Sequence, residues 1–427
     1  MDSRLGSTGH NVVIKVRKII VGSTGPINRK RRRVWASEPP LLFFLFPFSV
    51  TQGVRGQVKL FNLMDYGAVA DGATENSEAF VKGWKEACEW KGLARVLIPR
   101  GTYMVKSVRF EGPCKGQMSL VIKGVLKAPT DPTNFSTDSW INFRYADRLT
   151  VSGGGTLDAQ GQLAWRFNDC NKDSHCPALP TTMRFDFVTN ARIHHLRSID
   201  SKNNHFVIFG CENVNISNIR ISAPGDSPNT DGIKIGSSHR IRISRSIIGT
   251  GDDCIAMLPG ATKVHISKVV CGPGHGISVG SLGKNGDGDD VTGVVVKNCT
   301  FRGTSDGVRI KTWASPSVGR ASNFLYQDIF MDHVGNPIII DQEYCPYPPC
   351  SQQASLLQIS NVTYRNIWGI SGSKVAVTLR CSESRPCKNV VVENIDLAYG
   401  GPDGPATALC SHVNGVSLGH QSPPPCI

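Results

Sequence analysis

The sequence has little that is typical of helical, membrane-spanning or zinc-binding proteins. Turn residues, such as those at 224–228 and 283–288, separate its short apolar segments, and helical patterns are scarce between them. A doubly wound α/β fold needs crossover helices there, so the pattern argues against it. The run at 41–50 has ten mostly apolar residues broken by Pro47, too few to cross a bilayer. The fourteen cysteines include no CxxC pair, which argues against zinc.

A short alternation of apolar and polar residues recurs along most of the chain. With 44 Gly, 25 Pro and 7% aromatics in 427 residues, the composition suits a turn-rich all-β domain. Period-two alternation over β-branched residues predicts short strands with one buried face. The pattern restarts at positions 214, 241, 264, 294, 324, 357 and 390. We therefore predict a parallel β-helix with variable loops, and the alternative is a sandwich or barrel.

One helix is predicted near the start of this domain, over residues 77–90. Asn76 or Ser77 can cap it, and one stripe holds Phe80, Trp84, Ala87 and Cys88. A solenoid has an exposed apolar end, so we predict that this helix covers it, with a plain surface helix as the alternative. The segment Val96–Pro99 is predicted to be the first strand.

The N-terminal segment, at 1–58, differs from the rest of the chain in charge. Up to Arg55 it carries ten Lys/Arg and two Asp/Glu, a net +8, which leaves about +5 of the total +13 for the remainder. The basic run at 29–33 and the apolar run at 41–50 are similar to the n- and h-regions of a secretory signal, although they start well inside the chain. We predict a leader at 1–58, removed or disordered, and a β-helix domain at 59–427. A nuclear-localisation or nucleic-acid signal is the competing explanation of the basic run.

Cysteine usage favours an oxidising compartment. The fourteen cysteines all follow the leader, and the pairs 345/350 and 381/387 can each close a small loop as a disulfide. Four sequons, at Asn134, Asn215, Asn298 and Asn361, fit a glycoprotein. We predict a secreted monomer with no nucleic-acid partner and no stable membrane insertion.

Four polar clusters recur at the spacing of one β-helix coil. They are Asn229-Thr230-Asp231, Gly251-Asp252-Asp253-Cys254, Gly274-His275-Gly276 and Arg309-Ile310-Lys311. The interval from Asp231 to Asp252 is nearly the same as the interval from Asp253 to His275, and each matches the length of one coil. Because residues one coil apart stack in a β-helix, this spacing predicts three carboxylates, an imidazole and two cations on one face.

Each cluster alone has an ordinary explanation. The first could be a turn, the GDDC cluster a loop or calcium site, His275 a turn histidine, and the Arg309/Lys311 pair a solvated strand edge. Asp252 and Asp253 would point to opposite faces of a regular strand, so shared work needs a bend, which Gly251 permits. Together the clusters suit acid-catalysed cleavage of an acidic sugar chain. That reaction needs one protonated carboxyl group and one carboxylate that activates water, and crowded carboxylates raise the pKa of one member. Arg309 and Lys311 are expected to bind the substrate's own carboxylates.

The clusters resemble the signature blocks of polygalacturonases, glycoside hydrolase family 28. The matching segments are Ser227–Ile233 (SPNTDGI), Gly251–Cys254 (GDDC), Cys271–Gly283 (CGPGHGISVGSLG) and Arg309–Trp313 (RIKTW). The likeness runs from about Phe61 to Cys426 and is greatest to the pollen exopolygalacturonases of plants. The resemblance implies a right-handed parallel β-helix that hydrolyses polygalacturonate by single displacement with inversion, without a metal or other cofactor.

The resemblance also implies roles for individual residues. Asp252 would be the general acid, Asp231 and Asp253 would activate water, and His275 would keep the acid protonated and oriented. The substrate would be held by Asn229, Arg309, Lys311 and Tyr344. The resemblance places a disulfide between Cys254 and Cys271 beside the site. The other suspected disulfide cysteines are Cys345, Cys350, Cys381, Cys387, Cys410 and Cys426. The expected partner is pectic polysaccharide in the plant cell wall.

Other functions fit parts of the same pattern. A pectate lyase would use the acidic cluster for calcium and Arg309 as its base, and a non-catalytic wall protein would only bind pectin. We predict removal of galacturonate from the non-reducing end, with loops 283–290 and 344–353 closing the cleft. The alternative is internal cutting of the chain. The stretch His239–Arg242 and the acidic loop 285–290 are expected near its walls.

Overall fold

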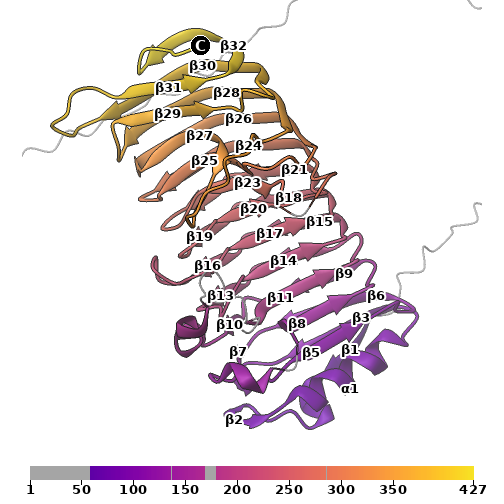
Figure 1. The fold of residues 1–427 in the computed structure, drawn as a ribbon. Helices are drawn as coiled ribbons and strands as arrows, with labels where there is room; N and C mark the ends of the chain where they lie inside the picture. Colours follow the sequence, from indigo (N-terminus) through magenta and orange to yellow (C-terminus); the bar gives the residue numbers. More distant parts are fainter. Residues whose placement is uncertain (1–57, 136, 169–178, 285) are drawn as a thin grey trace, which may run out of the picture. The chain divides into compact units, whose positions relative to one another are not determined.

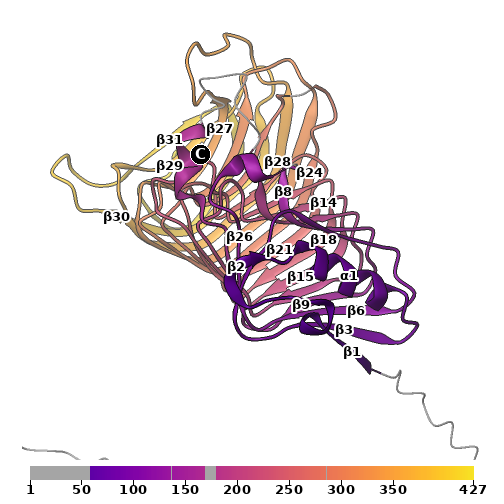
Figure 2. The same cartoon turned by 90° about the horizontal axis from the view of Figure 1, so that it is seen from below.

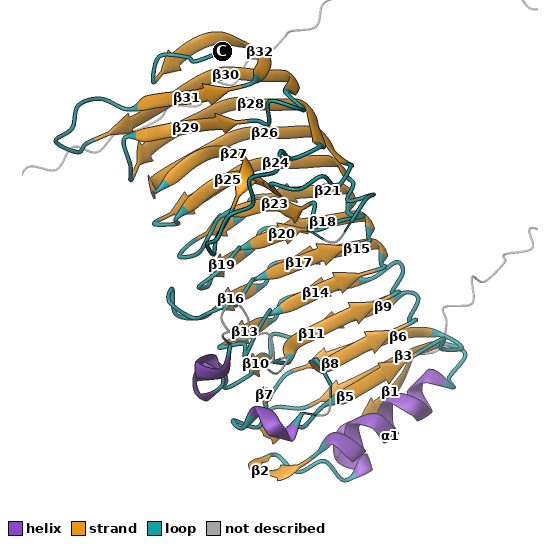
Figure 3. Cartoon of the chain, in the orientation of Figure 1, coloured by secondary structure: helices purple, strands orange, loops and turns teal. Residues whose placement is uncertain are grey.

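The computed structural model describes residues 58–135, 137–168, 179–284 and 286–427, and the predicted leader lies outside them except for Val58. These residues form one right-handed parallel β-helix, in which successive coils stack from the N-terminal helix to the C-terminus (Figures 1 and 3). The predicted fold class is thus confirmed, and the sandwich and barrel alternatives are wrong.

Two sheets build the coils. Sheet B contains β5 (Val108–Glu111), β8 (Ser139–Arg144), β11 (Thr181–Asp186), β14 (Phe206–Phe209), β17 (Ile233–Gly236), β20 (Ile255–Met257), β23 (Ile277–Leu282), β25 (Asp306–Trp313), β27 (Asn336–Tyr344), β29 (Val375–Arg380) and β31 (Thr407–Ser411).

Sheet A contains two strands per coil in the first half and one long strand per coil in the second. They are β1 (Val58–Asn62), β2 (Asp71–Glu75), β3 (Leu93–Ile98), β4 (Thr102–Met104), β6 (Gln117–Ile122), β7 (Val125–Lys127), β9 (Leu149–Ser152), β10 (Thr156–Asp158), β12 (Arg192–His194), β13 (Arg197–Ile199), β15 (Glu212–Ser217), β16 (Arg220–Ser222), β18 (His239–Ser244), β19 (Ile247–Gly249), β21 (Thr262–Ser267), β22 (Val270–Cys271), β24 (Val291–Arg302), β26 (Gly319–Val334), β28 (Leu357–Ser371), β30 (Cys387–Tyr399) and β32 (Val413–Ser422).

Apolar residues one coil apart stack inside the solenoid and set its register. In sheet B, Ile233 pairs with Ile255 and Ile255 with Ile277, so these two coils are equal in length. In sheet A the buried column runs through Val214, Ile241, Val264, Val294, Phe324, Val362 and Val390. The sequence pattern placed position 357 in this column. Phe324 instead pairs with Val362, because a longer loop precedes β28.

The helix α1 (Ser77–Cys88) packs against β3 and β5 across the first coils (Figure 2). Its predicted apolar stripe is buried, but neither Asn76 nor Ser77 caps it through a side chain. The Asn76 amide group instead bonds the backbone of Val69, Thr74 and Met104, which fastens the first coil. The segment around Val96 lies in β3 and is not the first strand, since β1 and β2 precede it. Along the described part of the chain, no helix has the length and apolar character needed to cross a bilayer.

Short 3-10 helices occupy four of the turns: η1 (Leu63–Tyr66), η2 (Pro132–Asn134), η3 (Gly161–Leu163) and η4 (Trp165–Phe167). Disulfides join five cysteine pairs among the described residues: Cys88–Cys114, Cys254–Cys271, Cys345–Cys350, Cys381–Cys387 and Cys410–Cys426. The eight cysteines suspected from sequence therefore form four of these links.

Candidate active site

The three carboxylates lie at the entrances to adjacent strands of sheet B. Asp231 precedes β17, and Asp252 and Asp253 precede β20. His275 follows one coil later, before β23, and its backbone N–H donates to the carbonyl of Asp252 at 2.8 Å. The residues at 251–254 form a bend rather than a regular strand, as the adjacent acids require. Stacking by coil therefore gathers the predicted residues at one site.

Close packing between coils dictates the glycine in this bend. A Cβ on Gly251 would overlap the carbonyl oxygen of Ser227 in the coil below. The backbone N–H of Gly251 donates to Thr230 Oγ1 at 3.0 Å, and that hydroxyl also contacts Ser227 Oγ at 2.7 Å. The Ser-Pro-Asn-Thr-Asp segment thus uses ordinary turn chemistry to fix the position of Asp231.

Asp253 is buried and bound by two cations. Its Oδ1 accepts from Arg309 Nη2 at 2.7 Å and from Ser278 Oγ at 2.7 Å, and its Oδ2 accepts from Lys311 Nζ at 3.0 Å. Burial opposes ionisation, but Lys311 and Arg309 outweigh it and hold the pKa of Asp253 well below its usual range. Asp253 is therefore a carboxylate. Arg309 and Lys311 are not a solvated edge, because both side chains are largely buried.

Asp252 is paired with the imidazole of His275. The distance from His275 Nδ1 to Asp252 Oδ1 is 3.1 Å, and the Asp252 side chain retains 22% exposure. Burial raises the pKa of Asp252, but the hydrogen bond from His275 more than offsets it, so the pKa lies below its ordinary value. The same hydrogen bond raises the pKa of His275. An imidazolium donor favours the carboxylate form, so in the free protein this contact lowers the pKa of Asp252. The role that the resemblance gives to His275 stays a prediction.

Asp231 has the highest pKa of the three carboxyl groups. Its side chain is 6% exposed, and burial raises its pKa to about 7. Lys234 Nζ, 3.2 Å from Asp231 Oδ1, opposes that rise, whereas Asp252 and Asp253 add to it. Three neighbouring carboxylates thus share a proton near neutral pH, as crowded acids do.

Aromatic and acidic groups complete the side of the site toward the C-terminus. Arg309 Nη1 also donates to Asp306 Oδ2 at 2.9 Å, which fixes the guanidinium. Lys311 Nζ lies 5.3 Å from the centre of the Tyr344 ring, and that ring contacts Trp313 edge-on. Tyr344, which the resemblance names as a substrate-binding residue, thus lies beside the cationic pair.

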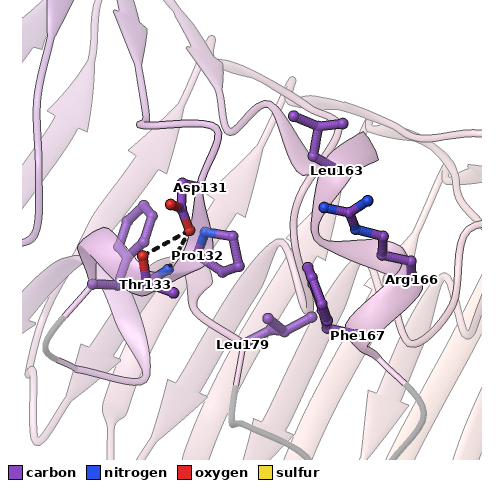
Figure 4. A pocket seen from close by; sticks show the side chains of 8 residues that line it. Asp131, Pro132, Thr133, Leu163, Arg166, Phe167 and Leu179 are labelled. Atoms are coloured by element: carbon purple, nitrogen blue, oxygen red, sulfur yellow. Dashed lines mark hydrogen bonds between the residues drawn. The ribbon is translucent and has the colours of Figure 1, made fainter.

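The opposite side of the site is built by the loop that contains η3 and η4. Asn229 Nδ2 donates to Asn168 Oδ1 at 2.8 Å, and Asn168 Nδ2 donates to the carbonyl of Pro228 at 3.0 Å. In Figure 4 this loop faces the η2 segment across a cavity of about 630 Å³. The cavity is mostly apolar, with Arg166 at its rim. This loop was not predicted from the sequence.

A metal ion fits this donor set poorly. Oxygen or nitrogen atoms of Asp252, Asp253 and His275 come within 4.8 Å of one another, which could accommodate an ion. However, Ser278, Arg309 and Lys311 already bind the two oxygens of Asp253. Two fixed cations would repel a third, and calcium prefers six to eight oxygen ligands.

Three contacts were missed from sequence: Lys234 on Asp231, Ser278 on Asp253 and Asp306 on Arg309. Each could have been found by aligning the coils, since Lys234 and Asp306 lie close in sequence to their partners and Ser278 lies in the CGPGHGISVG block. The stretch His239–Arg242 was placed near the cleft walls, but it lies in β18 of sheet A. Its alternation with buried Ile241 and Ile243 turns its polar side chains away from the core.

Comparisons with known proteins agree with this geometry. Residues 88–421 match the family model described as glycosyl hydrolases family 28. The chain is 46% identical to an exopolygalacturonase of Platanus acerifolia, over 87% of this chain and 99% of that protein. It is 44% identical to an exopolygalacturonase of Oenothera organensis, over 82% and 98%.

Solved structures share the fold at lower identity. An endo-xylogalacturonan hydrolase from Aspergillus tubingensis superposes with a TM-score of 0.73 and 24% identity, over 85% of this chain and 100% of that one. A hyperthermoactive exopolygalacturonase from Thermotoga maritima superposes with a TM-score of 0.68 and 19% identity, over 86% and 94%. At such identities the likeness establishes the solenoid architecture alone.

Proposed function

This chain belongs to glycosyl hydrolases family 28, and from that premise we propose that it hydrolyses the α-1,4 linkages of polygalacturonate and releases galacturonate from the chain end. The observation that carries the proposal is the buried cluster of Asp231, Asp252 and Asp253 next to Arg309 and Lys311. Carboxylates supply the acid and base of glycoside hydrolysis, and the adjacent cations suit a substrate with a carboxylate on each sugar.

We assign the chemical roles by position in the cluster. Asp252 is the most exposed of the three carboxyl groups, so it is the one that reaches the leaving oxygen as the general acid. Asp231 and the ionised Asp253 then activate the attacking water. In a single displacement, water attacks the anomeric carbon as the glycosidic bond breaks, Asp252 protonates the leaving oxygen, and the carboxylate pair takes the water's proton. The α-linked sugar is released as its β-anomer.

The proton for the first step belongs to the cluster as a whole. Burial gives Asp231 the highest pKa of the three carboxyl groups, about 7, so Asp231 is the group that most readily holds this proton in the free protein. For the acid step it must be on Asp252, so the active form is the one in which the cluster's proton has moved to that carboxyl group. The contact of His275 with Asp252 orients the acid and, by favouring the carboxylate, makes it readily release its proton.

Loops on two sides of the carboxylates are held by hydrogen bonds, and we propose that one of them closes the cleft at one end. Toward the C-terminus, Ser315 Oγ donates to the carbonyl of Gly283, and the backbone N–H of Val318 donates to Asp287 Oδ1 at 2.7 Å. Toward the N-terminus, Asn168 ties its loop to Asn229. We propose that such walls bind a chain end, and that Arg309, Lys311, Tyr344 and Asn229 hold the terminal sugars.

One reaction separates hydrolysis from its rivals. Incubation with polygalacturonate should release reducing ends without the ultraviolet absorbance of an unsaturated uronate, and proton NMR should show the β-anomer first. Absorbance growing in step with reducing ends would mean elimination and would overturn the proposal in favour of a pectate lyase. Binding without any new reducing ends would instead favour a non-catalytic wall protein.

We further propose that the protein is secreted as a glycosylated monomer to the plant cell wall, with residues 1–58 as its leader. Five disulfides among the described residues fit an oxidising compartment. The four sequon asparagines at 134, 215, 298 and 361 are all exposed. Treatment with an N-glycosidase should lower the apparent mass of the secreted protein, and N-terminal sequencing should locate the cleavage point.

A further inference from the structure

The outer face of sheet A has a row of arginines that the catalytic cluster does not use. Arg192 on β12 pairs in register with Asn215 on β15, and Asn215 pairs with Arg242 on β18. Adjacent strands are about 4.8 Å apart, so the two arginines are about 10 Å apart along the solenoid axis. On β12, β15 and β18 the exposed residues alternate with buried ones, so the arginines point away from the interior. The catalytic residues lie at the other sheet, where they precede strands of sheet B.

These arginines line a groove of about 370 Å³, which we call the arginine groove. Its lining contains Arg148, Arg192 and Arg242, together with amide side chains that include Gln117 and Asn215. No carboxylate is among the lining residues. The groove therefore combines positive charge with neutral groups that can donate and accept hydrogen bonds.

The two central arginines are free to bind a ligand. Arg192 and Arg242 are exposed, and neither guanidinium group has an ion pair or hydrogen bond with any residue in the described ranges. Two acids on neighbouring turns and strands, Asp147 and Glu212, already have partners. Asp147 accepts from Arg148 at 3.1 Å and from Thr189 and Asn190, and Glu212 pairs with Arg240.

We propose that the arginine groove is a second, non-catalytic binding site for polygalacturonate. The guanidinium groups of Arg192 and Arg242 would each bind a uronate carboxylate through paired N–H donors, and the amides would bind the sugar hydroxyls. The occupant follows from charge complementarity with the polymer of the catalytic site, so this inference rests on the proposed function. A chain held at one site raises the effective concentration of polymer at the other, which favours repeated attack on one chain.

A modification could compete for the same space. Asn215, in the middle of the groove, begins the sequon Asn215-Ile216-Ser217, and a glycan there would fill the groove. Ser217→Ala removes the sequon and leaves Asn215 and the lining unchanged. The test is therefore made in this background.

The test compares two matched double variants of the Ser217→Ala protein. Arg192→Ala/Arg242→Ala removes two groove charges, and Arg197→Ala/Arg220→Ala removes two exposed charges from β13 and β16 on the same sheet outside the groove. Binding to long polygalacturonate is measured by affinity electrophoresis or co-sedimentation at low salt. Turnover is measured on trigalacturonate, which is too short to occupy both sites.

We expect the groove variant to bind long polygalacturonate roughly three- to tenfold more weakly, as the loss of two exposed ionic contacts predicts. Its kcat and KM on trigalacturonate should stay unchanged, and the β13/β16 variant should bind within about twofold of its parent. Equal losses in both variants would overturn the proposal by showing a general effect of charge, and so would no loss in either. A groove variant that kept its affinity for polygalacturonate but lost binding to anionic vesicles or RNA would also overturn it.

The outcome is independent of the catalytic assignment. If the parent binds polygalacturonate through the groove but releases no galacturonate, the proposed hydrolytic function fails while the groove assignment stands. If it hydrolyses trigalacturonate and the groove variant binds the polymer as the parent does, the groove assignment fails alone.

Discussion

The same cationic residue types occur in two opposite settings in this solenoid. Arg309 and Lys311 on β25 are largely buried and both contact Asp253. Arg192 and Arg242 on sheet A are exposed, and their guanidinium groups have no partner among the described residues. In the first setting the cations fix the charge of a carboxylate that is needed for chemistry. In the second setting the guanidinium N–H groups have no partner in the described part of the chain, so they can bind a polymer instead. Burial and pairing, rather than residue type, separate the two roles.

The largest effect should come from the acid in the first setting. Asp252→Asn removes a transferable proton while keeping the shape and the contact with His275, so turnover should fall by about 10²- to 10⁴-fold or more. Initial rates on trigalacturonate measure this loss, and the melting temperature of the variant checks that the fold persists. Near-normal turnover would remove Asp252 from the acid role.

The buried cations should matter less than the acid but far more than the exposed arginines. Arg309→Ala and Lys311→Ala should each remove one charge-assisted hydrogen bond to a substrate carboxylate. Such a bond contributes about 1.5–3 kcal/mol, so kcat/KM should fall by roughly 10- to 150-fold. Part of that loss reflects the buried Asp253 left with one cation. Arg192→Ala serves as the matched control and should leave trigalacturonate turnover unchanged. An equal loss in all three variants would remove the distinction between the two settings.

The pH profile should report the proton shared in the buried cluster. Because Asp231 has a raised pKa of about 7, the cluster keeps one proton below that pH and loses it above. General acid catalysis needs that proton, so kcat/KM should fall about tenfold per pH unit above about pH 7. Asp231→Asn should move or abolish this upper limb. A limb that stays at the same pH in Asp231→Asn would assign it to another group.

The smallest effect is expected at the rim of the cleft. Asn168→Ala removes the bonds to Asn229 and Pro228, which loosens the wall on that side. We expect less than about a tenfold change in rate, since neutral hydrogen bonds contribute little, but a product mixture that includes short oligomers, resolved by anion-exchange chromatography. Asn389→Ala deletes an exposed amide far along the chain, on β30, and should leave the products as they are.

The solenoid could be predicted because its signal is local and repeated. Buried residues alternate within each strand, and the register repeats them once per coil, as at Ile233, Ile255 and Ile277. The same regularity predicted that Asp231, Asp253 and His275 lie together. Prediction failed where loop length changes, as at position 357, and where a side chain has competing partners, as Asn76 does.

The partners within the site could not be predicted from local patterns. Arg309 and Lys311 are two coils away from Asp253 along the chain, so their pairing depends on which coil each side chain faces. The sequence therefore predicted that both cations bind the substrate, whereas the structure shows them bound to Asp253. The prediction for the stretch His239–Arg242 was wrong for a related reason. Each coil contributes strands to two sheets, and composition does not say which sheet a strand joins.

The size of the first product tests most directly that the buried cluster is a chain-end hydrolase. Early in the digestion of polygalacturonate, the parent enzyme should release free galacturonic acid as the sole small product, while solution viscosity falls slowly. The Asp252→Asn variant should release almost none. A ladder of oligomers with a rapid early drop in viscosity would contradict the account, because it would show that the cleft is open and that the chain is cut internally.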